Sequence, residues 1–166
     1  MALKPDRSVY QDDISYFSRT VMERGGVVCQ EPQTLTTSNV PGSGAAMDTS
    51  AQKVAYASGI SDISGKIPVG LLLNDVVSID QSRQILNTYK SEMQVGDKVT
   101  LLKKGVVVTN MITSNSATGT VPVAAYLYSS GLLTDKAGYA ASGCPLVGTF
   151  LSRADADGYA KVQINL

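Results

Sequence analysis

The chain has 166 residues, 14 basic and 14 acidic side chains, and only 17% charged residues. A chain of this length is most simply one domain that builds its own hydrophobic core. Its balanced charge argues against broad attraction to nucleic acid or to an anionic membrane. No apolar run approaches the roughly 18 residues of a membrane span. The start, MALKPDRSVYQDD, lacks the apolar core of a signal peptide, so we expect the protein to be made and kept inside a cell.

Residues 1–26 are predicted to form an N-terminal arm that reaches outside a β-rich domain at 27–166. The Gly25-Gly26 pair would be the hinge between the two. Within the arm, Ile14, Phe17 and Val21 recur at helical spacing, so a short helix over 15–23 and an extended arm are both compatible with it.

The arm is also the predicted contact region, because aromatic and arginine side chains are enriched in interface cores. The residues expected to contact a partner or a neighbouring subunit are Arg7, Tyr10, Tyr16, Phe17 and Arg19. The alternative is that Ile14, Phe17 and Val21 pack on the domain's own core. The Asp12-Asp13 doublet is interpreted as a solvated polar face rather than as a catalytic carboxylate pair.

The middle of the chain is dominated by strand signals. Short β-prone runs separated by Gly, Ser, Pro and Asn clusters predict strands at 27–30, 33–37, 53–56 and 68–73. At 78–94 a helix and an irregular loop are equally compatible with the residues. Strands at 98–102 and 106–112 are predicted to form a tight hairpin around Lys103-Lys104-Gly105. Val106 to Val108 are apolar on both faces, which indicates a central or covered strand.

The C-terminal part predicts a polar loop at 113–121, a strand at 122–128, a turn at 129–131 and a closing hairpin. In that hairpin an apolar run at 146–151 and a strictly alternating run at 159–166 flank the turn cluster at 154–158. About eight to ten short strands with frequent turns predict an all-β, antiparallel Greek-key barrel or sandwich with at most one or two short helices.

Motifs that carry chemistry are incomplete. A phosphate loop at 59–67 would need Ser or Thr at position 67, which is Ile67. A calcium loop at 153–164 would begin at Arg153 and end at Ile164, neither of which supplies the required oxygen, so an exposed turn is predicted. The chain has no histidine, which excludes Ser-His-Asp and Cys-His catalysis. We therefore expect a protein that is not an enzyme and uses no cofactor.

The two cysteines, Cys29 and Cys144, are isolated in the sequence and lack CxxC spacing. They are expected to be buried thiols that behave as small apolar residues. Eight tyrosines leave a sugar-binding platform open, with Tyr126 and Tyr128 sharing one strand face.

Four segments, taken in order, resemble the capsid decoration (cement) proteins of tailed bacteriophages. They are GKIPVGLLLNDVV at 65–77, QVGDKVTLLKKGVVVTNMI at 94–112, AYLYSSGLLT at 125–134 and GCPLVGTFLSRADADGYAKVQINL at 143–166, with the flanking word PGSGAAMD at 41–48. The resemblance covers most of the chain from about residue 42. It implies a non-enzymatic virion protein that is made in the host cytoplasm, lies on the capsid exterior, binds the major capsid protein and braces the shell. A homotrimer is implied by the same analogy, with a dimer as the alternative.

Two other classes of function stay open on the residues alone. One is a receptor- or carbohydrate-binding module of a virion, and the other is a small β-barrel enzyme that uses carboxylates. The absence of histidine and the near-zero net charge count against the enzyme.

Overall fold

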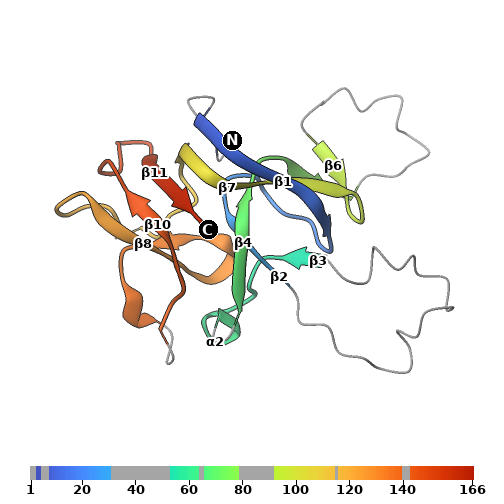
Figure 1. Ribbon diagram of the computed structural model, residues 1–166. Coiled ribbons are helices and arrows are strands. Elements are labelled where there is room, and N and C mark those ends of the chain that lie inside the picture. The colour runs from blue at the N-terminus through green and yellow to red at the C-terminus, as the bar shows by residue number, and fades with distance from the viewer. Residues whose placement is uncertain are drawn as a thin grey trace, which may run out of the picture.

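A small closed barrel is the framework that positions the N-terminal segment. The computed structural model describes residues 3–4, 8–30, 53–63, 66–78, 92–114, 116–139 and 143–166. Around the ring, the hydrogen-bonded strands are β1 (Ser8–Ser18), β3 (Lys53–Ala55), β2 (Val27–Gln30), β4 (Ile67–Leu72) and β7 (Lys98–Thr109), and β7 pairs with β1 to close it (Figure 1). The β1–β3 pairing is parallel and the other pairings in the ring are antiparallel. The all-β expectation is therefore confirmed.

A second group of strands extends from β7 beyond the barrel. It continues through β11 (Ala160–Asn165), β10 (Leu146–Phe150), β8 (Val123–Leu127) and β9 (Leu133–Thr134). Buried and exposed residues alternate strictly along β11, which confirms the predicted closing hairpin. Because β11 pairs with β7 on one edge and β10 on the other, this last strand is tied into the sheet.

The remaining described elements are short. β5 (Asp75–Val77) and β6 (Glu92–Gln94) form a separate parallel pair. The described helical segments are α2 (Ile60–Ile63) and two single 3₁₀ turns, η3 (Ser129–Gly131) and η4 (Ala137–Tyr139). The predicted strand at 33–37 lies outside the described residues, as does most of the ambiguous 78–94 segment.

Two hydrophobic clusters lie on opposite faces of the central strands. One, which we call the barrel cluster, includes Val28, Leu72 and Leu101 and joins residues of the barrel strands. The other includes Leu71 and Leu102 and packs them against the strands beyond β7. Neighbouring residues of β4 and of β7 thus enter different clusters, because successive side chains of a strand point to opposite faces. These strands are buried on both faces, which explains their nearly continuous apolar character.

The predicted hairpin at Lys103-Lys104-Gly105 is wrong, since β7 runs through it as one strand of 12 residues. Gly105 is needed because β1 and β7 approach each other closely at this position, and not because the chain turns there. A Cβ on Gly105 would lie 2.3 Å from the Ser8 carbonyl oxygen, where β1 pairs with β7. The expectation that this stretch is a central strand is confirmed, because β7 pairs with β1, β4 and β11.

The N-terminal segment also differs from expectation. Residues 8–18 are extended and lie in the barrel, so a helix starting at residue 15 is wrong and the segment does not stand apart from the sheet. Long-range pairing with β7 outweighs the helical spacing of Ile14, Phe17 and Val21. The Gly25-Gly26 pair is buried: the Gly25 N–H donates to the Leu72 carbonyl, and the Leu72 N–H donates to the Gly26 carbonyl.

Tyr56 closes over that glycine pair. A Cβ on Gly26 would lie 2.6 Å from the Tyr56 hydroxyl, so a side chain at this position would displace the tyrosine ring. Burial raises the pKa of Tyr56, whose hydroxyl donates to the Glu23 carbonyl. The predicted hinge is therefore a packed connection between β1 and β2.

Candidate interaction surface

The first part of β1 is an open edge of the barrel. From Ser8 to Phe17, β1 pairs along one edge with β7 (Figure 1). Along its other edge, β3 pairs only with Phe17 and Ser18. Among the described residues, no strand pairs with this second edge before Phe17. An open strand edge presents backbone N–H and C=O groups that another chain can bind.

Large apolar side chains are exposed along this same stretch. Tyr10 is 75% exposed, Ile14 is 62% exposed and Val9 is 43% exposed. These are three of the nine large apolar residues exposed in the described part of the chain, and they fall within six consecutive positions. We call Val9, Tyr10, Asp12 and Ile14 the β1 surface. Exposed apolar residues concentrated in this way are typical of interaction sites.

Asp13 fastens the β1 surface to β7. One carboxylate oxygen lies 2.9 Å from Lys103 Nζ, and the other accepts hydrogen bonds from the Ser15 hydroxyl and from its N–H, the latter at 2.9 Å. Partial burial acts to raise the pKa of Asp13, but the hydrogen bonds from Ser15 and Lys103 outweigh it and lower the pKa to about 2. The hydrogen bond to Asp13 in turn raises the pKa of Lys103. Both groups are therefore charged at neutral pH.

Asp12, the neighbour of Asp13, is in a different situation. Its side chain is exposed and forms no hydrogen bond or ion pair with any described residue. The doublet thus contains one carboxylate that is neutralised within the fold and one that faces solvent. Composition alone could not separate these two roles.

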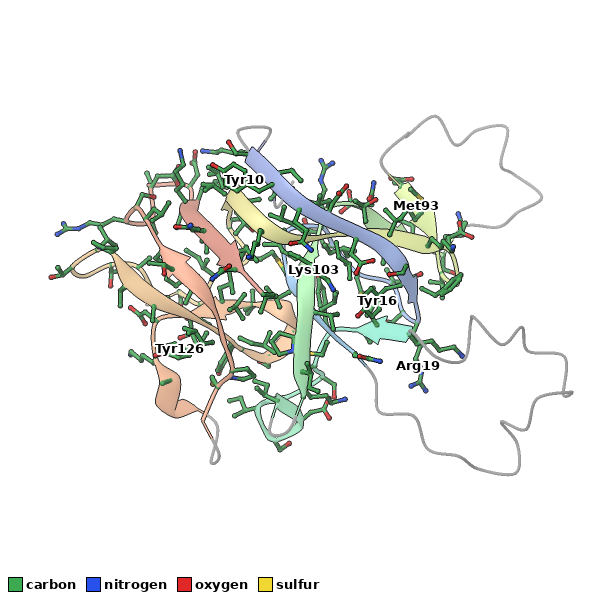
Figure 2. All side chains as sticks on the ribbon, viewed as in Figure 1. Tyr10, Tyr16, Arg19, Met93, Lys103 and Tyr126 are labelled. Carbon is green, nitrogen blue, oxygen red and sulfur yellow. The ribbon has the colours of Figure 1, made fainter. Side chains whose placement is uncertain are left out.

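The sequence-predicted contact residues divide into two groups. Tyr10 and Arg19 are exposed, whereas Tyr16 and Phe17 are half-buried. Figure 2 shows Tyr10 near the start of β1, Tyr16 farther along it, and Arg19 just beyond its end, with Lys103 of β7 beside the strand. Arg7 lies outside the described residues.

Tyr16 and Phe17 are packing residues as much as surface residues. Tyr16 packs against the barrel cluster, and the Lys103 ammonium lies 5.5 Å from its ring centroid. Lys98 lies at the same distance, 5.5 Å, from the Phe17 ring centroid. These cation–π contacts hold the end of β1 against β7. The predicted set of contact residues did not include Val9, Asp12 and Ile14. The signal that could have pointed to them is an acidic residue, Asp12, with apolar residues two positions before and after it.

The turn between β10 and β11 is a second anchoring point for the N-terminal segment. Lys4 Nζ lies 3.0 Å from an Asp155 carboxylate oxygen and 4.2 Å from the Tyr159 ring centroid. The hydrogen bond from the Tyr159 N–H makes the largest contribution to lowering the pKa of Asp155, and the hydrogen bond from Lys4 lowers this pKa further. Asp155 to Asp157 are exposed, as the predicted turn requires.

The remaining sequence candidates have structural roles. Cys29 and Cys144 are both free and buried, as expected, and burial raises the pKa of Cys29 to about 11. Lys66, in the incomplete phosphate loop, lies 3.5 Å from an Asp62 carboxylate oxygen. Tyr126 and Tyr128 are half-buried, which does not favour an exposed sugar-binding platform.

Within the described ranges, no three Cys, Asp or Glu side chains come together as metal ligands would. A helix suited to crossing a membrane is also not found in that part of the chain. Comparison of the sequence and fold with known proteins finds no matching family model, curated protein or solved structure.

Proposed function

We propose that the protein is a structural virion protein that binds the outer surface of a tailed-phage capsid and stabilises contacts between major capsid protein subunits. The observation that carries this proposal is the β1 surface, where an open strand edge and exposed apolar side chains coincide. The resemblance of residues 42–166 to decoration proteins supplies the class of partner.

The physical logic suits a repeating shell. A capsid presents many copies of one local surface, so a homo-oligomer can touch several subunits at once. Linked weak contacts then strengthen binding by roughly 10² to 10⁴ through effective concentration. The proposed oligomer is a trimer, by analogy with the decoration proteins.

The anchoring of β1 supports a preformed contact surface. The Asp13–Lys103 ion pair and the cation–π contacts at Tyr16 and Phe17 hold the strand before any partner arrives. A preformed surface loses less conformational entropy on binding than an arm that orders on contact. The β1 surface would thus act as a rigid brace between shell subunits.

Cosedimentation with shells tests the proposal. The purified protein is mixed with shells of the parent phage that lack it, and bound protein is measured after pelleting. We expect saturable binding by the wild type and at least a tenfold loss in the double variant Tyr10→Ser, Ile14→Ser.

The matched control is Ile67→Ser with Leu151→Ser, which removes two exposed apolar side chains elsewhere. It should bind like the wild type. A wild-type protein that stays in the supernatant at every concentration contradicts the proposal. Specific binding on a glycan array would instead favour the carbohydrate-binding alternative.

A further inference from the structure

We propose that the open edge of β1 takes up an extended strand of the partner that carries Lys or Arg opposite Asp12, with apolar residues to either side. This inference deepens the proposed function, on which it rests, because it names the kind of partner segment that is bound. It also assigns Asp12 a role in choosing the partner.

The backbone argument comes from the pairing of β1. Its second edge is open before Phe17 in the described part of the chain, so its outward N–H and C=O groups have no partner strand there. Addition of an extended segment to such an edge provides main-chain hydrogen bonds, and side chains then determine specificity.

The side-chain argument comes from three exposed residues that lie within five consecutive positions of β1. Tyr10 and Ile14 are exposed apolar residues, and exposed Asp12 lies between them. Unlike Asp13, which Lys103 neutralises, Asp12 forms no ion pair with any described residue. A cation on the incoming strand would supply the missing opposite charge, while its apolar residues would cover Tyr10 and Ile14.

The same arrangement disfavours a second copy of β1 as the occupant. An antiparallel pairing that sets Tyr10 of each copy against Ile14 of the other also sets the two Asp12 carboxylates opposite each other. Like charges directly opposite are destabilising in a sheet. A homotrimer has no two-fold axis, so it does not require β1 to pair with itself.

Two probe peptides test the charge requirement. They are heptapeptides of alternating Thr and Val that differ only at the central residue, Lys in one and Glu in the other. Binding to the ¹⁵N-labelled full chain is followed by amide chemical shifts at millimolar peptide. We expect shifts at residues 8–15 and a preference of about threefold to tenfold for the Lys peptide.

Charge reversal provides the matched comparison. Asp12→Lys should invert the preference toward the Glu peptide. Asp157→Lys makes the same charge change in the exposed β10–β11 turn and should keep the wild-type preference. Sedimentation of the wild type and of Tyr10→Lys reports whether β1 pairs with itself.

The possible outcomes are distinct. A preference inverted only by Asp12→Lys supports the proposal. Equal binding of both peptides, no shift at residues 8–15, or a wild-type dimer that Tyr10→Lys dissociates would each overturn it. The peptide assay contains no capsid, so its failure leaves shell attachment to be decided by cosedimentation.

Discussion

Replacing Asp13 by Asn tests whether its ion pair with Lys103 holds β1 against β7. The pKa of Asp13 falls from 3.8 to about 2 in the fold, which corresponds to about 2.5 kcal/mol of stabilisation at neutral pH. The Asn side chain can still accept hydrogen bonds from Ser15, so only the Lys103 contribution is lost. The Asp13 and Lys103 side chains are 22% and 25% exposed, so water screens the pair. We expect Asp13→Asn to cost about 1 kcal/mol at pH 7.

The pH dependence gives this prediction its sign. Because the folded pKa lies below the unfolded one, the stabilisation is present above about pH 4 and is lost as the pH falls through about 2. Urea denaturation followed by circular dichroism, at pH 7 and pH 2, measures the free energy of unfolding. The difference between wild type and Asp13→Asn should be several times smaller at pH 2 than at pH 7, because most of the carboxylate's contribution is lost by pH 2.

Asp12→Asn is the matched control, since Asp12 has no ion pair among the described residues. It should change the free energy of unfolding by less than about 0.5 kcal/mol at either pH. An Asp13→Asn effect of equal size at pH 2 and pH 7, or an equal effect of Asp12→Asn, would refute the reasoning.

Two further predictions concern packing. Gly105→Ala should destabilise the fold by about 2 to 3 kcal/mol, because the new Cβ would lie 2.3 Å from the Ser8 carbonyl oxygen. Gly119→Ala, with nothing within 4 Å of its Cβ, is the control; similar unfolding midpoints for both variants would contradict the close approach of β1 and β7. Cys29, with its pKa raised from 9.0 to about 11, should react with a thiol reagent at pH 8 at least about 100-fold more slowly in the native protein than in urea. Reaction of Cys29 at the same rate in both states would show that it is not buried.

The location of the candidate surface was predictable from the sequence, but the residues that form it were not. The concentration of aromatic and arginine residues in 1–26 pointed to the region that includes the β1 surface, and Tyr10 is fully part of it. Tyr16 was indistinguishable from Tyr10 in the sequence, yet it packs against the barrel cluster. Exposure of Ile14 depends on which side of β1 faces the barrel, and no local pattern contains that information.

Local patterns by themselves determined the all-β class, β2 at Val27–Gln30 and the closing hairpin of β10 and β11, because a two-residue period and a turn cluster act over a few positions. Only the tertiary structure decided that Lys103 to Gly105 continue a strand and that β1 closes the barrel. A turn at Gly105 and a helix from Ser15 are locally acceptable. The turn at Gly105 is overridden because β7 pairs with β1, β4 and β11, and the helix from Ser15 is overridden because β1 pairs with β7. These partner strands lie up to about 100 positions away along the chain. The same long-range pairing brings Asp13 to Lys103 and leaves the Asp12 side chain in solvent. Because Asp12 and Asp13 are adjacent and identical, the sequence alone could not tell which of them forms the ion pair.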